Sequence, residues 1–173
     1  MIIFLIGFMG CGKSYVARNL APILEIDYID LDKLIEENEQ LSVKDIFEQK
    51  GENYFREKEK EFIEQLDPTE NLIVSTGGGA PCFFNNMQLM NEKGLTIYLN
   101  RNKEKTIWRL LKGQYKRPLI ANLSAEELEK FYDEKLASRK QFYEQARLHV
   151  GDAEVEEIAD LILQHFNTTE ATF

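Results

Sequence analysis

The stretch GFMGCGKS, residues 7–14, directly follows the apolar run MIIFLI at the start of the chain. Its spacing, Gly-x-x-x-x-Gly-Lys-Ser, is the pattern of a phosphate-binding loop. Glycines let the backbone bend so that successive N–H groups point into one concavity, and the N-terminus of a following helix favours an anion. We therefore predict that the phosphates of a nucleotide are held by Gly10, Cys11, Gly12, Lys13, Ser14 and Tyr15.

The segments on either side of this loop support the prediction. IIFLI has the length and the β-branched content of a strand, and KSYVARNLAPIL carries apolar residues at helical spacing. In such a loop Lys13 reaches the β- and γ-phosphates, and the Ser14 hydroxyl ligates Mg²⁺. The sequence thus predicts a nucleoside triphosphate site with Mg²⁺ as cofactor.

Composition limits the remaining choices. The chain has 173 residues, of which 43% are hydrophobic and 29% charged, and this suits one domain with a sizeable core. It has no apolar run that could cross a bilayer and no basic signal-peptide region, so we expect a cytoplasmic protein with no membrane partner. A net charge of −9 argues against a nucleic-acid partner. Because no coiled-coil heptads are visible, a monomer is expected.

Strands and helices are predicted to alternate along the chain. The expected strands are 2–6, 27–30, 72–75, 95–99 and 147–150. The expected helices are 13–24, 32–38, 43–65, 83–92, 103–111, 125–145 and 154–165. Alternation of this kind predicts an α/β domain in which a five-stranded parallel sheet lies between helical layers.

Two segments depart from this simple alternation, and a polar tail follows the last expected helix. The helical insertion 32–65, between the second and third expected strands, is predicted to form a wall of the substrate site. The stretch KGQYKRPLIANLS, residues 112–124, is polar, basic and poorly patterned, and is predicted to be a mobile lid. The polar tail 166–173 is expected to fray.

Two carboxylates follow the second expected strand, in the stretch DYIDLDKL. Strand alternation would put Asp30 and Asp32 on one side of the sheet at its carboxyl end, where ligands bind in parallel α/β proteins. One could hold the water shell of Mg²⁺, and the other could accept a proton from an attacking hydroxyl. The alternative is that Asp32 only caps the helix that follows.

Further ligand contacts are predicted from a glycine run and from three arginines. STGGGAP, residues 75–81, ends the third expected strand and would expose N–H groups beside an open space, although a plain turn would also explain it. Arginine presents a planar fork that fits carboxylate or phosphate, although a single arginine is more often a surface charge. The candidates are Arg56, Arg117 and Arg139.

The motifs GFMGCGKS, DLD, FREKE, STGGGA, RPLI and SRKQFYEQA together resemble those of the shikimate kinases, in family order over nearly the whole chain. The resemblance implies an enzyme that transfers the γ-phosphoryl group of ATP to the 3-hydroxyl of shikimate in aromatic amino-acid biosynthesis. It also implies one P-loop kinase domain over residues 1–173, of the nucleoside-monophosphate-kinase-like branch, with strand order 2-3-1-4-5.

The resemblance implies roles on the acceptor side of the site. Asp32 would bind shikimate hydroxyls and act as the catalytic base. Arg56 and Arg139 would clamp the shikimate carboxylate. The pocket would be lined by Gly77, Gly78 and Gly79, with a backbone N–H of this run contacting the substrate.

It also implies roles on the donor side. Asp30 would support Mg²⁺ through water, beside the Ser14 ligand. Lys13 and Arg117 would assist catalysis at the phosphates, Arg117 by swinging in from the lid. Arg109, in IWRLLKG, would stack on the adenine.

Three other functions are compatible with the phosphate-binding loop. A gluconate kinase also takes a polyol acid, but it is not expected to carry the FRE and GGG motifs together. A nucleoside monophosphate kinase would need a base pocket, which residues 32–65 do not suggest. A regulatory nucleotide-binding module would have lost catalysis, and the intact set of charged residues argues against such a loss.

Overall fold

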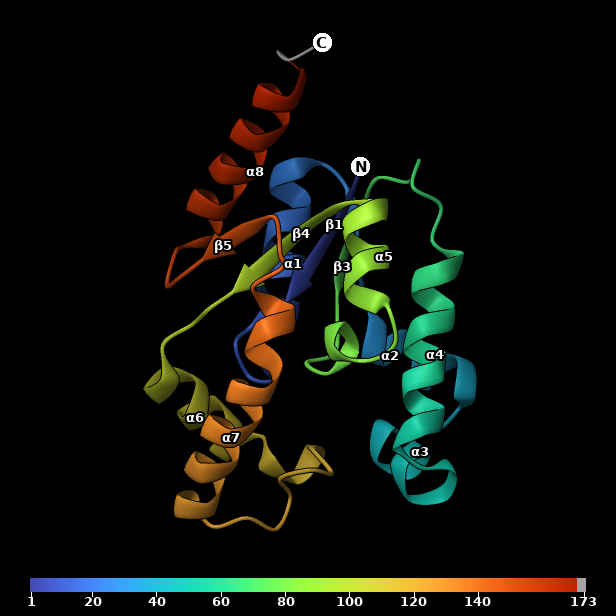
Figure 1. Ribbon diagram of the computed structural model, residues 1–173, viewed down its shortest axis with the longest axis vertical. Helices are drawn as coiled ribbons and strands as arrows, with labels where there is room; N and C mark the ends of the chain where they lie inside the picture. The colour runs from blue at the N-terminus through green and yellow to red at the C-terminus, as the bar shows by residue number, and fades with distance from the viewer. Residues whose placement is uncertain (171–173) are drawn as a thin grey trace.

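The computed structural model of the chain, which describes residues 1–170, contains a parallel sheet covered by helices on both faces (Figure 1). The strands are β1 (Ile2–Ile6), β2 (Asp27–Asp30), β3 (Leu72–Ser75), β4 (Leu95–Leu99) and β5 (Leu148–Val150). Their order across the sheet is β2-β3-β1-β4-β5, and every neighbouring pair is parallel. The predicted fold class and strand order are confirmed.

The helices fill the connections between the strands. They are α1 (Lys13–Leu24), α2 (Leu31–Glu39), α3 (Val43–Lys50), α4 (Glu52–Gln65), α5 (Asn86–Lys93), α6 (Lys103–Lys112), α7 (Ala125–Tyr143) and α8 (Val155–Glu170). Two short 3₁₀ helices, η1 (Ala80–Cys82) and η2 (Gln114–Lys116), complete the set. None of the helices within residues 1–170 is long and apolar enough to cross a membrane.

Strand β1 divides the apolar core into two layers. Its Ile3 and Leu5 belong to the cluster formed with α1 and α8. Its Ile2, Phe4 and Ile6 belong to the cluster formed with the other helices. All five residues of β1 are buried, as expected of a central parallel strand that is covered on both faces, and this explains its uninterrupted apolar run.

The sheet brings three chain segments together at its carboxyl edge. The phosphate-binding loop leaves β1, Asp30 ends β2, and the glycine run follows β3. Figure 1 shows α6 and α7 projecting beyond the sheet on one side and α3 and α4 on the other. In parallel sheets ligands bind at this edge, so the topology places the candidate site before any side chain is considered.

Three of the expected elements differ in the structure. The helix predicted over 43–65 is two helices, because Gly51 between them has φ 86° and ψ 164°, a conformation that glycine adopts readily and other residues do not. The helix predicted from residue 83 begins at Asn86, after η1. Helix α8 continues to Glu170, so residues 166–170 of the predicted frayed tail are helical, and 171–173 lie outside the described residues.

Gly94, which joins α5 to β4, gives a test of this packing. A Cβ at this position would lie 2.9 Å from the Ile2 carbonyl carbon and closer still to its oxygen. The Ile2 backbone can move away only at a cost to the packing of β1. Gly94→Ala should therefore lower the free energy of unfolding by roughly 2–4 kcal/mol, measured by urea denaturation.

Gly151→Ala is the matched control, because a Cβ there would meet no atom within 4 Å. Equal, small losses of stability in the two variants would contradict the close approach of Gly94 to β1.

Candidate active site

The phosphate-binding loop takes its shape from glycines in the left-handed region. Gly7, Gly10 and Gly12 have φ values of 138°, 80° and 97°. A Cβ on Gly7 would lie 2.9 Å from the carbonyl oxygen of Leu99. The loop therefore turns tightly against the end of β4 and delivers the chain into α1, whose N-terminus favours an anion.

Lys13 closes this loop. Its side chain is buried, and its Nζ donates to the carbonyl oxygens of Gly7 at 2.8 Å and of Phe8 at 3.0 Å. It lines a cavity of about 280 Å³ together with Gly10, Gly12, Ser14 and Tyr15. The Cys11 side chain is turned inward and buried, 3.8 Å from Lys13 Nζ, so Cys11 offers the loop its backbone.

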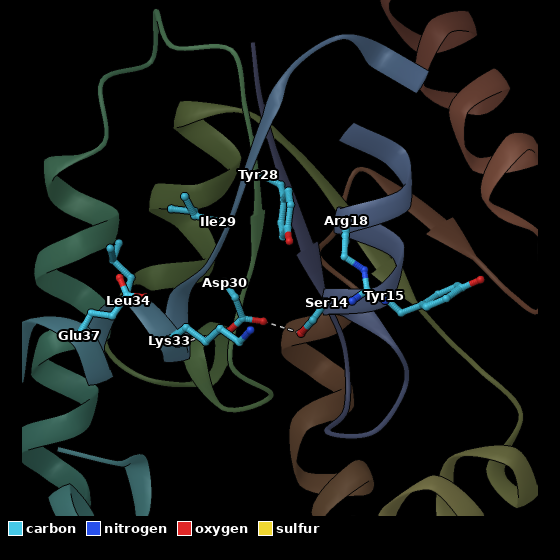
Figure 2. A pocket seen from close by; sticks show the side chains of 9 residues that line it. All are labelled: Ser14, Tyr15, Arg18, Tyr28, Ile29, Asp30, Lys33, Leu34 and Glu37. Carbon is cyan, nitrogen blue, oxygen red and sulfur yellow. Dashed lines mark hydrogen bonds between the residues drawn. The ribbon is translucent and has the colours of Figure 1, made fainter. Parts of the chain in front are cut away.

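A cluster of oxygen atoms lies beside the loop. Ser14 Oγ donates to Asp30 Oδ2, the bond drawn in Figure 2, and Ser75 Oγ lies 3.2 Å from Ser14 Oγ and 3.3 Å from Asp30 Oδ2. Residues 1–170 contain no group of three His, Cys, Asp or Glu side chains that could hold a metal by themselves. Mg²⁺ is usually bound through only one or two carboxylates plus substrate phosphates. A small cluster of protein oxygens beside a phosphate site therefore suits this ion.

Contrary to the prediction from the sequence, Asp30 and Asp32 are not related by strand alternation, because helix α2 begins between them. Asp30 ends β2 and is the N-cap of α2, where its Oδ1 accepts from the Lys33 backbone N–H at 3.4 Å. Asp32 lies in the first turn of the helix, so strand alternation does not place it. The cap is therefore Asp30, and the alternative reading of Asp32 as a cap is wrong.

Asp32 instead points into the site. Its Oδ1 is buried and has no hydrogen-bond partner within residues 1–170. Burial, and next to it the negative charge of Asp30, raise the pKa of Asp32 to about 6. A buried carboxylate without a partner is costly unless a ligand completes it, which makes this oxygen a candidate for substrate contact.

A second cavity, of about 380 Å³, adjoins the phosphate cavity and shares Asp32, Arg117 and part of the glycine run with it. Its other walls come from the insertion α2–α4, from the segment after η2 and from α7. Among its lining residues are all the predicted acceptor-side residues, Asp32, Arg56, Gly77, Gly78, Gly79 and Arg139. The structure therefore brings these residues together.

Arg56 and Arg139, two of the three arginines that line this cavity, differ in how they are paired. Arg56 is buried; its Nη1 donates to Glu59 Oε2 at 2.7 Å and its Nη2 to Glu52 Oε1 at 2.8 Å. Arg139 is equally buried, and its Nη1 has no hydrogen-bond partner within the described chain. An anion in the cavity would supply the acceptor that Arg139 lacks.

The glycine run lets side chains from other elements approach closely. A Cβ on Gly77 would lie 2.7 Å from Asp32 Oδ1 and closer still to Glu59 Oε1. A Cβ on Gly79 would lie 2.6 Å from the Arg56 guanidinium carbon. These glycines are therefore needed for space as well as for exposed N–H groups.

Glu59 is the site residue to which the sequence interpretation assigned no role. It is fully buried, and burial together with the charge of Asp32 outweighs Arg56 and raises the pKa of Glu59 to about 7. Like Asp32, it leaves one buried oxygen, Oε1, without a partner in residues 1–170. Its position three residues after Arg56, on the same face of α4, was the available signal in FREKE.

Arg117 and Arg109 both line the cavity beside the phosphate-binding loop. Arg117 is half-buried, donates from Nη1 to the Gly113 carbonyl at 2.8 Å, and lines both cavities. Arg109 Nη1 lies 3.5 Å from the carbonyl oxygen of Cys11. Mobility of the segment 112–124 and stacking of Arg109 on adenine both stay predictions.

A third hollow, of about 530 Å³, lies beside β2 (Figure 2). Ser14 and Asp30 form its floor, and the rest of its lining comes from α1, β2 and the outer face of α2: Tyr15, Arg18, Tyr28, Ile29, Lys33, Leu34 and Glu37. It has no counterpart among the sequence predictions.

A phosphate-binding loop at the head of a β2-β3-β1-β4-β5 sheet, with a second polar cavity beside it, defines a P-loop kinase. The sequence model of the shikimate kinase family matches residues 9–167. The chain belongs to the shikimate kinase family.

Individual relatives agree with this assignment. The shikimate kinase of Flavobacterium johnsoniae is 42% identical over 168 residues, covering 92% of this chain and 98% of the relative. That of a Sulfurihydrogenibium species is 43% identical over 149 residues, covering 86% of each.

Solved structures agree as well. Shikimate kinase from Bacteroides thetaiotaomicron superposes with a TM-score of 0.87 at 34% identity, covering 96% of this chain and 98% of that one. Shikimate kinase from Acinetobacter baumannii, solved in complex with shikimate, gives 0.85 at 30% identity, covering 97% of this chain and 93% of that one. A gluconokinase from Sinorhizobium meliloti, at 15% identity and 0.51, shows a shared fold only.

The buried Glu59 carboxyl predicts a pH-dependent stability. Its pKa is raised from 4.5 to about 7, so in that window the folded chain binds more protons than the unfolded chain. The free energy of unfolding should therefore fall as pH rises from about 4.5 to 7. Glu59→Gln should make this fall shallower by roughly 1–3 kcal/mol, measured by urea denaturation at several pH values.

Glu61→Gln is the control, because Glu61 lies on the same helix and pairs with Lys58 in solvent. Its pH slope should match that of the wild type. A Glu59→Gln slope identical to the wild-type slope would show that Glu59 is ionised throughout this range.

Proposed function

We propose that this chain transfers the γ-phosphoryl group of ATP to the 3-hydroxyl of shikimate, giving shikimate 3-phosphate and ADP. One observation carries the proposal: Asp32, with its unpartnered oxygen, lines both the phosphate cavity and the cavity that holds Arg56 and Arg139. An acceptor hydroxyl at Asp32 would thus face the donor phosphate, while a carboxylate on the same molecule would face the arginines.

The acceptor cavity has the chemistry that a small polyol acid requires. Arg139 has a free, buried donor for a carboxylate, and Arg56 is held in place by Glu52 and Glu59. A planar guanidinium can bind a carboxylate through two parallel hydrogen bonds. Support also comes from the related Acinetobacter baumannii enzyme, which was solved with shikimate bound.

The donor side needs positioning and charge neutralisation more than covalent chemistry. Lys13 would exchange its bonds to the Gly7 and Phe8 carbonyls for phosphate oxygens. Ser14 and Asp30 would hold Mg²⁺, which neutralises phosphate charge when bound. Arg117, at the border of the two cavities, would add a further positive charge and help to exclude water from the transfer.

Asp32 would act as the base. Burial and Asp30 raise its pKa to about 6, so at pH 7 it is mostly ionised and yet more basic than an exposed aspartate. It would accept the proton of the attacking hydroxyl as the bond to phosphorus forms and the bond to the ADP oxygen breaks.

The choice of acceptor is tested directly by ADP release from Mg·ATP with shikimate, gluconate and nucleoside monophosphates in parallel. We expect strong stimulation by shikimate alone. Stimulation by gluconate or by a nucleotide would overturn the acceptor assignment while keeping the phosphate-binding loop. ATP binding without any stimulation would favour a regulatory module.

Asp32→Asn tests the base. The substitution keeps the shape and removes proton acceptance, so kcat should fall roughly 10²–10⁴-fold while the KM for shikimate changes far less, in steady-state assays.

Glu37→Gln is the matched control. Glu37 lies on the same helix, is exposed, and lines neither the phosphate cavity nor the acceptor cavity. Its kcat should stay near the wild-type value. An unchanged kcat in Asp32→Asn would exclude Asp32 as the base.

The predictions of a monomer, of a cytoplasmic location and of no nucleic-acid partner rest on the sequence and stay predictions.

A further inference from the structure

Tyr143, the last residue of α7, makes a long-range contact with the glycine run. Its side chain is fully buried, and its hydroxyl donates to the carbonyl oxygen of Gly78 at 2.5 Å. Its ring stacks on Tyr98 of β4, with centroids 5.1 Å apart and an interplanar angle of 30°. The hydroxyl is therefore aimed by a ring that the sheet itself holds in place.

This contact fixes the direction of one peptide group. The peptide between Gly78 and Gly79 is trans, and in a trans peptide the C=O and the N–H point in opposite directions. The carbonyl of Gly78 is anchored on Tyr143, which does not line the acceptor cavity, whereas Gly79 does. The Gly79 N–H therefore points away from Tyr143, toward the cavity side.

Two further observations agree with this orientation. Within residues 1–170 the Gly79 N–H has no protein acceptor, whereas the carbonyls of Gly77, Gly78 and Gly79 all accept a hydrogen bond. The other side of Gly78 is packed on the phosphate loop, because a Cβ there would lie 2.9 Å from the Met9 nitrogen. The peptide is thus clamped between α7 and the loop.

The same helix also places the unpaired arginine. Arg139 precedes Tyr143 by four residues, which is about one helical turn, so both residues lie on the face of α7 that is turned toward the glycine run. Helix α7 therefore fixes the position of the Arg139 guanidinium and, through the Tyr143 hydroxyl, the orientation of the Gly79 N–H.

We propose that Tyr143 is a positioning residue for the acceptor: its hydroxyl holds the Gly78–Gly79 peptide so that the Gly79 N–H donates to an oxygen of the bound polyol acid. This inference rests on the proposed function of the chain. Burial raises the pKa of Tyr143, so its hydroxyl stays protonated and remains a donor.

Tyr143→Phe is the direct test. It keeps the stacked ring and removes the hydroxyl, which anchors the peptide and also lies beside the Arg139 guanidinium. A hydrogen bond of this kind is worth roughly a three- to tenfold change in an equilibrium. The KM for shikimate should rise by about that factor, while kcat and the KM for ATP stay within about twofold, because the lost contact is present in the ground state and the transition state alike.

Tyr98→Phe is the matched control. It removes the hydroxyl of the other ring of the stacked pair, which lies 3.3 Å from Asn100 Oδ1 and away from the glycine run. Its KM values should both match the wild type. If Tyr143 only stabilised the fold, its loss would lower the melting temperature without raising the KM for shikimate selectively. A folded Tyr143→Phe variant in which the KM values for shikimate and ATP change equally, or in which neither changes, would overturn the proposal.

A second measurement needs no variant. The chain has ten glycines, so ¹⁵N-glycine labelling gives a simple amide spectrum of the wild type. Adding shikimate without nucleotide should shift the assigned Gly79 amide. An unmoved Gly79 amide under saturating shikimate would overturn the proposal even if Tyr143→Phe fails to fold.

Failure of the proposed function is read separately. If the wild type turns over another acceptor, the acceptor assignment falls, and the two tyrosine variants are compared with that acceptor instead. A selective rise in its KM for Tyr143→Phe alone would still support the positioning role, and no such rise would end it.

Discussion

The absence of side chains after β3 is the constraint on which this site depends. At Gly77 the space of a Cβ is taken by the carboxylates of Asp32 and Glu59, and at Gly79 by the guanidinium of Arg56. At Gly78 it is taken by the backbone of the phosphate-binding loop. Donor loop, acceptor carboxylate and acceptor arginine can meet only because this backbone is bare.

The meeting of these groups has an electrostatic cost that a ligand would relieve. Asp32 and Glu59 each keep one buried oxygen without a partner, and Arg139 keeps one buried donor without a partner, within the described chain. Burying such groups without partners is unfavourable by about 1–3 kcal/mol each. A molecule with hydroxyl donors and one carboxylate would satisfy both kinds of group, which is the chemistry of the acceptor proposed for this chain.

The fold by itself would not have identified the acceptor. A gluconokinase structure shares the architecture at low sequence identity, and a shared fold leaves the acceptor open. The acceptor cavity is built by the α2–α4 insertion and by α7, which supply Arg56 and Arg139. In this chain, therefore, the acceptor cavity depends on elements beyond the strands and the phosphate-binding loop.

The sequence by itself determined the strand–helix alternation, the phosphate-binding loop and the kinase family, because these depend on local spacing and on motifs in chain order. It also named Asp32, although for a wrong reason: helix α2, begun by the Asp30 cap, places this residue, and strand alternation does not. Only the tertiary structure revealed the burial of Glu59 beside Asp32 and the contact of Tyr143 with the glycine run. Their partners lie on other elements or in a shared buried cluster, and contacts across 65 residues of chain, such as Tyr143 to Gly78, leave no periodic signal in the sequence.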